Sequence, residues 1–502
     1  MTNRKKFFLN GIILSAVGLS MRTVGLIFGA FVSRAIGAEG TGLYTLVMTV
    51  YSFAVTLATS GIGLTITRLV ASAVGEKRHG DIGRILKGAF IYALLFSVLS
   101  SITLSFGAGF LSEKIIRDAR SVRALRLLSL SLVPVALGAV FSGYFVGIKR
   151  VGINSAVQVI SQLAKIVFTV ILVTKTAGLG TEKSVGALVL GIVIAEFISF
   201  LLMLMQFLIN RRKSAKRGTP MLSDVSKTAL PLAFSAYIRS GLITLEHALI
   251  PKRLRDGGKD NVESLSSYGA LHGMALPLVL YPMSPLSSFS GMLVPEFAEG
   301  QSQEERIGRI TAEVLNNTLA YATAIAIFLY SFSEELGYVI YHSYDAGIYT
   351  SLIAPVVPIM YLDHVTDSML KGLGEHVFSM WVNITDSLLS ILLVWFIIPK
   401  LGIGGYALVI IIMEGYNFAL SFIRLKKKIR FSLNPAYALV IPALCATLAS
   451  LTSGLVFVFN GSAATPLWLI LKMVFAAAVF FTAFLTLRLL RDTLFDCQKA
   501  RI

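Results

Sequence analysis

The sequence predicts an all-α polytopic membrane protein of about fourteen transmembrane helices, built as two six-helix lobes related by a parallel repeat, with two further C-terminal helices. Composition is the first reason: 55% of the 502 residues are hydrophobic and 14% are charged, and the mean hydropathy is +0.76. Soluble domains carry about 25% charged residues. The second reason is a series of long apolar runs, and the third is an internal repeat.

Each apolar run can cross the hydrocarbon core, which takes about 20 residues of helix. The first run continues past the apolar region of a signal peptide without a clear cleavage site, so we interpret it as a membrane helix. The longest runs fit single helices if these are tilted. The predicted membrane segments are residues 8–35, 43–74, 84–111, 124–147, 152–175, 184–209, 226–251, 266–295, 309–333, 346–371, 376–399, 403–424, 436–459 and 466–490.

Two of these segments, 266–295 and 346–371, contain several prolines. Proline removes a backbone donor and clashes with the preceding turn, so both helices are expected to be kinked. Such kinks suit helices that bend during transport, and they equally suit static bends that neighbouring helices absorb.

Basic residues give the chain a net charge of +18 and gather between the apolar runs. This is the positive-inside pattern of membrane proteins rather than the surface of a nucleic-acid-binding protein. It predicts a multi-pass protein of the cytoplasmic membrane with both termini in the cytoplasm. Two basic clusters nevertheless fall on the predicted outer side. The simpler interpretation is that they are solvated helix ends, and the alternative is that they form a cavity entrance that attracts anions. Their residues are Lys114, Arg117, Arg120, Arg123, Arg126, Lys252, Arg253, Arg255 and Lys259.

An internal repeat divides the chain. Gly75–Ile85 aligns without a gap to Gly300–Ile310, and the same register pairs Gly147 with Gly372. Because both copies place the motif on the inner side after the same number of helices, the repeat is parallel. The predicted parts are a six-helix lobe over 1–210, a cytoplasmic linker over 211–225, a second six-helix lobe over 226–430, and two extra helices with a cytoplasmic tail over 431–502.

Arg22 lies well inside the first apolar run, and Arg239 has a similar surrounding sequence in the second half. A guanidinium at that depth costs a few kcal/mol or more unless it faces a wet cavity or a partner, and it stays charged. We therefore predict one polar central cavity to which each half contributes an arginine. Arginine binds phosphate oxygens through a planar fork, so the cavity suits a pyrophosphate group. Lys165 and Arg68 complete the predicted substrate-binding set, although Arg68 lies near a helix end and could reach the interface instead.

Acidic and amide side chains recur at helical spacing in the second half. Asn383 and Asp386 are three residues apart, and Asp363 and Asp367 are four apart, so each pair lies on one helix face. Oxygen ligands of this kind can hold a sodium ion or exchange a proton. These four residues are therefore candidates for a coupling-ion site.

Glu246 joins this candidate site because it follows Arg239 by seven residues, about two turns along the same helix face. Salt bridges from these carboxylates to Arg239 or Lys371 are the competing interpretation. No other cofactor or metal is expected, since Cys445 and Cys497 match no metal-binding or redox spacing.

Three further charges inside apolar runs are expected to have structural roles. Glu196 and Glu414 occupy comparable helices of the two halves and are each expected to form a hydrogen bond. Lys472, the only charge within the last two runs, lies near a predicted helix end and is expected to snorkel to the interface. The last two helices would then form a lipid-facing appendage.

The loops between the runs are too short for a catalytic domain, and the sequence has no P-loop, nucleophile elbow or metal-binding His/Cys set. We therefore predict that the protein is not an enzyme. The alternative from the enzyme class, a membrane-embedded glycan polymerase or ligase, would usually bring a larger extramembrane segment with paired acids than Gly257–Ser264.

Three stretches resemble the oligosaccharide flippases of the multidrug/oligosaccharidyl-lipid/polysaccharide exporter superfamily, in particular the stage V sporulation protein B group and then the lipid II flippases. They are Arg34–Tyr44, Leu249–Leu254 and Leu293–Glu296. The resemblance implies two six-helix lobes around a central cavity that alternates between inward-open and outward-open forms. The cargo would be an undecaprenyl-pyrophosphate-linked oligosaccharide, and the last two helices would form a groove for its lipid tail.

The resemblance also assigns residues. Arg22 falls on a cavity arginine of the lipid II flippases, but their following Arg-Asp pair reads Phe28 and Gly29 here. This departure counts against lipid II as the cargo. A sodium site on the seventh and eleventh helices occurs in some relatives, and the nearest residues here are those of the candidate coupling-ion site.

The function that follows is translocation of a lipid-linked oligosaccharide for cell wall, spore cortex or surface polysaccharide. Its expected partners are this substrate, membrane lipids and proteins of polysaccharide or cell-wall synthesis, and not nucleic acid. A cation-coupled multidrug exporter of the same superfamily is the main alternative, and its cavity should be richer in aromatic residues and poorer in arginine.

Overall fold

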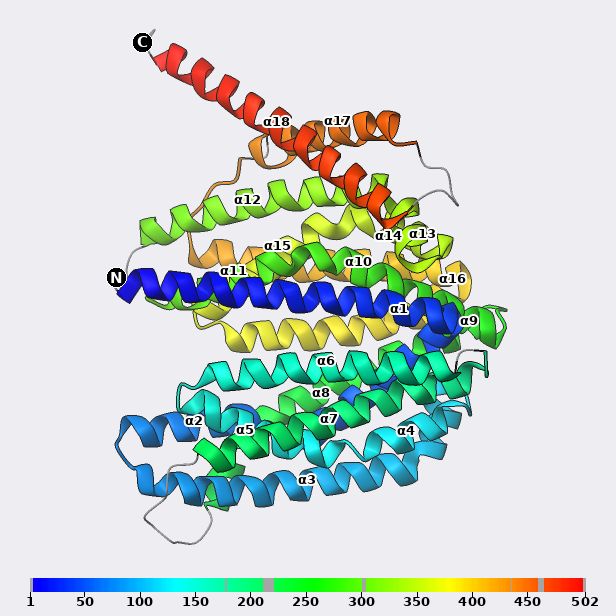
Figure 1. Cartoon of the computed structure of the whole chain (residues 1–502). Coiled ribbons are helices and arrows are strands. Elements are labelled where there is room, and N and C mark those ends of the chain that lie inside the picture. The colour runs from blue at the N-terminus through cyan, green and yellow to red at the C-terminus, as the bar shows by residue number, and fades with distance from the viewer. Residues whose placement is uncertain are drawn as a thin grey trace. The chain divides into compact units, whose positions relative to one another are not determined.

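The computed structural model describes residues 3–499 apart from 177, 211–220, 300–303, 435 and 459–464. Its regular structure in these residues is entirely helical, and every predicted membrane segment coincides with helix there (Figure 1). Most of the predicted linker and four residues of the second repeat motif lie outside the described residues. Contacts divide the chain into two compact units, residues 35–266 (the continuous unit) and residues 1–34 with 267–502 (the discontinuous unit).

This division differs from the predicted lobes, since residues 1–34 group with the second half of the chain. The lobe boundaries at 1–210 and 226–430 therefore stay a prediction. Each unit is described by itself below.

The continuous unit consists of packed apolar helices, among which α6 and α7 run side by side and α5 packs on α2, α3 and α7 (Figure 1). Its elements are the later part of α1 (Asn3–Thr59), α2 (Ile62–Gly75), η1 (His79–Asp81), α3 (Ile82–Phe110), the π-helical turn η2 (Leu111–Ile116), α4 (Ser121–Ser129), α5 (Leu132–Gly147), α6 (Val151–Thr176), α7 (Thr181–Asn210), α8 (Leu222–Asp256) and most of α9 (Asn261–Tyr268).

Two predicted runs of this unit are broken, the first where the sequence has no proline and the second just before Pro134. Run 43–74 divides into α1 and α2 at Ser60 and Gly61, whose φ angles are +44° and +71°. A Cβ on Gly61 would lie 3.1 Å from the carbonyl oxygen of Ala229, so α8 approaches the break closely. Run 124–147 divides into α4 and α5, which are bent by 42°.

The discontinuous unit contains the earlier part of α1 and the chain from η3 onward. Its elements are η3 (Gly269–Ala275), α10 (Leu276–Leu280), η4 (Tyr281–Met283), α11 (Ser284–Glu299), α12 (Glu304–Ser331), α13 (Ser333–Tyr341), α14 (Tyr344–Ile353), η6 (Ala354–Val356), α15 (Val357–Gly372), α16 (His376–Lys428), η7 (Ala436–Val440), α17 (Ile441–Val456) and α18 (Pro466–Lys499). Its core lies among α11, α12, α15 and α16 around Phe297, Val365 and Met369.

The kinks predicted from proline are present in this unit. Run 266–295 is interrupted by the 3₁₀ turn η4 around Pro282, and run 346–371 by the 3₁₀ turn η6 around Pro355. Each proline removes a donor from the helical ladder, and the chain tightens into a 3₁₀ turn there. The short helix α13 lies between two predicted runs and was not expected.

Ten helices of the described chain are long and apolar enough to cross a membrane, and the bent pair α4–α5 would make an eleventh. Two of these ten hold two predicted runs each, because α1 and α16 continue through a break at Gly37 and Gly402, where φ is positive. Run 266–295 is divided among helices too short to span alone. The chain is a multi-pass membrane protein with the helical order that the apolar pattern predicts.

Two glycines that align in the repeat have the same packing role. A Cβ on Gly147 of α5 would lie 2.9 Å from the Cβ of Val70 on α2. A Cβ on Gly372 of α15 would lie 2.7 Å from both the Cβ of Phe297 and the carbonyl oxygen of Val294 on α11. Only glycine lets these helix pairs approach so closely.

Candidate functional site

Arg22 projects from α1 in the discontinuous unit as an exposed side chain. Its Nη1 donates to Ser284 Oγ at 3.1 Å, and the neighbouring Thr23 Oγ1 lies 2.8 Å from the hydroxyl of Tyr281. Both partners lie at the proline break between η4 and α11, where Ser284 Oγ also donates to the Tyr281 carbonyl at 2.7 Å. The break thus supplies polar groups that hold an intramembrane arginine in place.

Arg239 is exposed on α8 in the continuous unit and makes no ion pair within the described residues. The same helix makes polar contacts with the end of α1 and the break after it, with Thr56 donating to Ser240 Oγ at 3.4 Å and Tyr237 donating to Ser60 Oγ. Because Arg22 and Arg239 belong to different units, the shared cavity predicted for them stays a prediction.

Lys165, on α6 of the continuous unit, is half-buried and interacts electrostatically with Glu196 on α7. The predicted substrate-binding lysine therefore faces a carboxylate. Glu196 also acts on Tyr51, whose hydroxyl lies 2.7 Å from Ser131 Oγ. Arg68 is exposed in the middle of α2 and not near a helix end as the sequence suggested.

The five candidate coupling-ion residues do not all lie in one unit. Glu246 is half-buried on α8 of the continuous unit, whereas the other four lie in the discontinuous unit. Asp367 forms an ion pair with Lys371 at 2.5 Å, which confirms the competing interpretation for this residue. Asn383 uses its amide Nδ2 to donate to the Ser379 carbonyl at 2.6 Å.

Asp363 on α15 and Asp386 on α16 interact electrostatically, and Glu414, from the later half of α16, joins them. Asp363 also accepts a hydrogen bond from Ser421. The sequence predicted only a structural hydrogen bond for Glu414. It reaches the other carboxylates because α16 folds back at Gly402, as the 3.1 Å hydrogen bond from the Tyr416 hydroxyl to Thr385 Oγ1 shows.

We call Asp363, Asp386 and Glu414 the carboxylate cluster. Among the described residues, no three acidic, histidine or cysteine side chains lie close enough together to hold a metal ion. The cluster nevertheless gathers three carboxyl groups in one helical unit, an arrangement in which carboxylates can share a proton.

The expectation for Lys472 was wrong. Lys472 on α18 is buried with 3% of its surface exposed, and its Nζ lies 2.7 Å from Glu335 Oε1 on α13. The rings of Phe332 and Trp468 lie 5.0 and 5.2 Å from the same ammonium. The carboxylate partner comes from the short helix that the apolar pattern did not reveal, so the lysine has no need to reach the interface.

Comparison with known proteins identifies the family of this chain. A family model described as "Polysaccharide biosynthesis protein" matches residues 8–301. The chain belongs to the polysaccharide biosynthesis protein family. The curated relatives of this chain include Stage V sporulation protein B of Bacillus subtilis (strain 168), 26% identical over 420 residues and covering 81% of each chain. Sporulation protein YkvU of the same organism is 20% identical over 358 residues, covering 69% of this chain and 78% of the relative.

Solved structures show which fold this polysaccharide biosynthesis protein has. The lipid II flippase MurJ in an inward closed conformation matches with a TM-score of 0.74 at 13% identity, covering 96% of this chain and all of MurJ. An inward-facing multidrug resistance transporter of the MATE family matches with a TM-score of 0.65 at 14% identity, covering 82% and 98%. The fold is that of the multidrug/oligosaccharidyl-lipid/polysaccharide exporter superfamily, as the sequence resemblance predicted.

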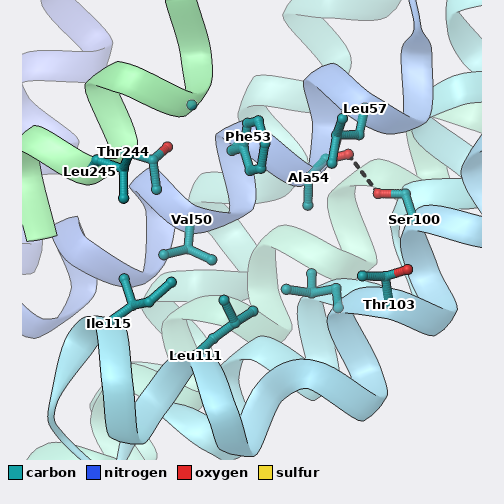
Figure 2. A pocket seen from close by; sticks show the side chains of 12 residues that line it. Val50, Phe53, Ala54, Leu57, Ser100, Thr103, Leu111, Ile115, Thr244 and Leu245 are labelled. Atoms are coloured by element: carbon teal, nitrogen blue, oxygen red, sulfur yellow. Dashed lines mark hydrogen bonds between the residues drawn. The ribbon is translucent and has the colours of Figure 1, made fainter. Parts of the chain in front are cut away.

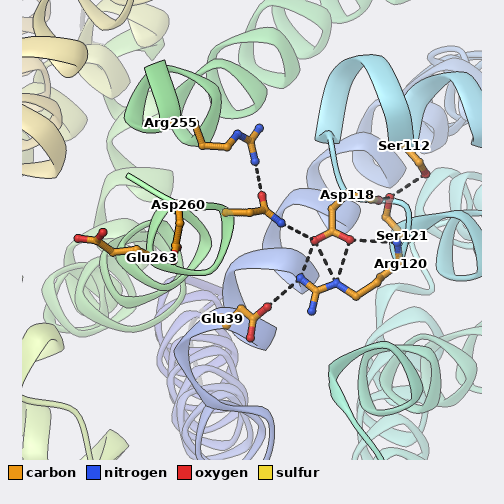
Figure 3. A network of polar contacts seen from close by, with 9 residues as sticks. Glu39, Ser112, Asp118, Arg120, Ser121, Arg255, Asp260 and Glu263 are labelled. Atoms are coloured by element: carbon orange, nitrogen blue, oxygen red, sulfur yellow. Dashed lines mark hydrogen bonds and ion pairs between the residues drawn. The ribbon is translucent and has the colours of Figure 1, made fainter. Parts of the chain in front are cut away.

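Besides the predicted residues, this family member has a polar network in its continuous unit (Figure 3). Arg120 Nη2 lies 2.6 Å from Asp118 Oδ2 and 2.8 Å from Glu39 Oε1. Asn261 Nδ2 donates to Asp118 Oδ2 at 3.3 Å and accepts from Arg255 through its own Oδ1. Burial would raise the pKa of Asp118, but the hydrogen bonds and charge of Arg120 outweigh burial and hold that pKa below its usual range.

This network joins three regions that are separate in the sequence. They are α1 just after its break at Gly37, the turn between η2 and α4, and the end of α8 with the first residue of α9. The two basic clusters of the predicted outer side are therefore in contact within one unit. Arg120 is neither a solvated helix end nor an open anion site, because two carboxylates already hold it.

An apolar pocket of about 300 Å³ lies in the same unit (Figure 2). Its walls come from α1, α3 with η2, and α8, so we call it the α1–α3–α8 pocket. Almost all of its lining is apolar, and Ser100 turns its hydroxyl away to the Ala54 carbonyl at 2.8 Å. The lining includes Val50, Phe53, Leu111, Ile115, Gly241 and Leu245.

Proposed function

We propose that this protein is a flippase that moves an undecaprenyl-pyrophosphate-linked oligosaccharide across the cytoplasmic membrane by alternating access. The observation that carries the proposal is Arg22, an exposed guanidinium in a membrane helix, held by Ser284 at the proline break. A permanent charge at this depth needs an anionic partner or water. The pyrophosphate of a lipid-linked sugar is such a partner, and guanidinium binds it through two parallel hydrogen bonds.

The relatives support this cargo class. Stage V sporulation protein B belongs to sporulation, and MurJ is named as a lipid II flippase. Phe28 and Gly29 stand where the lipid II flippases carry an Arg-Asp pair, so we propose a lipid-linked sugar other than lipid II. Arg239, Lys165 and Arg68 are proposed to contact the head group at other stages of transport. Both termini are proposed to lie in the cytoplasm, and proteins of polysaccharide or cell-wall synthesis are the proposed partners.

The carboxylate cluster is our proposed site for the coupling ion, either a proton or sodium. Asp363 and Asp386 were chosen from their spacing, and Glu414 joins them through the fold-back of α16. Uptake of a cation would remove the repulsion among three carboxylates, and this links ion binding to a conformational change. Asn383 and Asp367 are proposed to tune this site from the same unit, and Glu246, in the continuous unit, is proposed to act on ion coupling separately.

The test is flipping of labelled undecaprenyl-pyrophosphate sugars in proteoliposomes. Arg22→Ala should lower the rate at least 100-fold, because it removes the head-group contact. Thr23→Val is the matched control, since it changes the neighbouring residue and its contact with Tyr281 but leaves the guanidinium. Asp386→Asn should leave slow flipping that no longer responds to a proton or sodium gradient. A fully active, well-inserted Arg22→Ala protein would reject the proposal.

A cation-coupled drug exporter is the second candidate, favoured by the similarity to the MATE transporter and by the carboxylate cluster. The same vesicles decide between the two. Export of cationic dyes that is lost in Asp386→Asn, together with no flipping of any lipid-linked sugar, would establish the exporter.

A further inference from the structure

In the continuous unit, an arginine that makes no ion pair within the described residues lies near the α1–α3–α8 pocket. On one wall of the α1–α3–α8 pocket, η2 ends one residue after Ile115, and Arg117 follows directly as an exposed side chain. On the opposite wall, α8 continues from Leu245 to Arg255. Those ten residues of helix span about 15 Å, which is half the thickness of the hydrocarbon core.

Arg255 is only partly satisfied by the protein. Its Nη1 donates to Asn261, but its Nη2 is buried and has no hydrogen-bond partner within the described residues. The carboxylates that act electrostatically on its charge are Asp118 and Asp256. Each of these two carboxylates already forms an ion pair with another arginine.

Asp118 is held by Arg120 at 2.6 Å, and Asp256 is held by Arg253 at 2.8 Å. Arg117, which is close enough to repel Arg255, makes no ion pair in the part of the chain that the structure describes. Arg117 and Arg255 therefore lie close enough to repel each other, and a buried N–H of Arg255 is left without an acceptor in the described part of the chain.

We propose that the continuous unit binds an anionic phospholipid, with its phosphate on Arg255 and Arg117 and one acyl chain in the α1–α3–α8 pocket. Phosphate oxygens match the planar donor fork of arginine. The pocket, at about 300 Å³, has about twice the volume of a cavity that holds benzene. Its walls belong to membrane-spanning helices, so a chain from the bilayer can enter where a soluble anion or a peptide has no apolar match.

This site is distinct from Arg22 and from the carboxylate cluster, which lie in the other unit. The inference does not rest on the proposed transport function, and it gives one arginine from each of the two predicted outer basic clusters a defined ligand class. It also gives Asn261 a role, because this residue orients Arg255 while it binds the Asp118–Arg120 pair (Figure 3).

The experiment uses the purified, lipid-depleted full-length protein and native mass spectrometry. The probes are phosphatidic acid, diacylglycerol with the same chains, and inorganic phosphate. Phosphatidic acid should bind at least tenfold more tightly than either other probe, because only it supplies both a phosphate and a chain. Arg255→Gln should weaken this binding about tenfold. Arg253→Gln is the matched control, since Arg253 lies on the same helix with its own carboxylate.

A second pair of variants tests the pocket independently of charge. A Cβ on Gly241 would meet the Phe53 ring at 3.5 Å, which is ordinary contact, so Gly241→Ala should fold and bind lipid normally. Gly241→Leu should fill the pocket and weaken binding of phosphatidic acid about tenfold.

Equal binding of inorganic phosphate would overturn the lipid assignment, and equal binding of diacylglycerol would overturn the role of the arginines. Unchanged binding in both Arg255→Gln and Gly241→Leu would overturn the site. If Arg255→Gln does not give a monodisperse protein, Arg255→Lys, which keeps the charge but loses the fork, should bind a few-fold more weakly. The Gly241 pair then decides the outcome.

Discussion

Gly147 of α5 lies against Val70 of α2 in the continuous unit, and Gly372 of α15 lies against Phe297 of α11 in the discontinuous unit. The two glycines align in the internal repeat, so the same close approach of helices serves both units. Without a side chain at these positions, each pair of helices can come within a distance that other residues would prevent.

The charged groups of the two units differ much more than their packing. The pair of Lys472 and Glu335 in the discontinuous unit has side chains that are 4% and 9% exposed. The pair of Arg120 and Asp118 in the continuous unit includes an arginine that is 31% exposed. The repeat therefore accounts for how the helices approach one another, while each unit has developed its own electrostatics.

Breaking the buried pair should have the largest effect. Lys472→Met leaves Glu335 buried without its partner, which typically costs about 3–5 kcal/mol. The measurement is thermal unfolding of the purified protein in detergent. The double variant with Glu335→Gln should recover most of the loss, and Arg120→Gln in the other unit should cost less. A Lys472→Met protein as stable as the wild type would show that the pair is not sequestered.

The packing glycines should come next. Gly372→Ala places a methyl group against a carbonyl oxygen and should cost about 1–3 kcal/mol. Gly147→Ala should cost less, because its nearest neighbour is the side chain of Val70 rather than backbone. Gly186→Ala is the control, since a Cβ there meets nothing within 4 Å. Unfolding temperatures in the reverse order would contradict the common packing role.

Acid should weaken the continuous unit through Asp118. Its pKa in the folded protein lies below its usual range, so its stabilising effect is present above the unfolded value of about 4 and is lost as the pH falls below that value. Asp118→Asn should lower the unfolding temperature at pH 7, and its difference from the wild type should shrink between about pH 5 and pH 3. A difference that does not change with pH would mean that the carboxylate charge contributes nothing.

The smallest effect is expected at Arg68. This exposed side chain makes no ion pair within the described residues, so Arg68→Gln should change the free energy of unfolding by no more than about 0.5 kcal/mol. If it contacts substrate, as the sequence predicts, flipping should slow without any change in stability. A large loss of stability would instead reveal a structural partner.

The sequence was sufficient for the membrane segments and for the proline breaks, because both depend on local apolar length and on missing backbone donors. It did not reveal the break at Ser60, which depends on the close approach of α8. It also missed α13, whose nine residues are too short for the apolar pattern. The burial of Lys472 follows from that helix and was therefore mispredicted.

The candidate site was predictable only within single helices. The spacing of Asp363 and Asp367 predicted one shared helix face. It could not predict that Asp367 pairs with Lys371 while Asp363 interacts with Ser421 and Asp386 of α16. Glu414 joins the carboxylate cluster because α16 folds back at Gly402. Residue spacing within one apolar run cannot predict such a contact. Which of these residues contact one another is decided by the packing of helices that are distant in sequence, and not by residue type.

The turn at Gly402 has a consequence for how the protein is made. The two apolar runs of α16 are joined without a loop, and Tyr416 contacts Thr385 across the turn. We therefore expect the two runs to enter the membrane together as a helical hairpin. Asp386 and Glu414 then pass through the bilayer beside polar side chains of the opposite run rather than alone in hydrocarbon, where a single charge is costly.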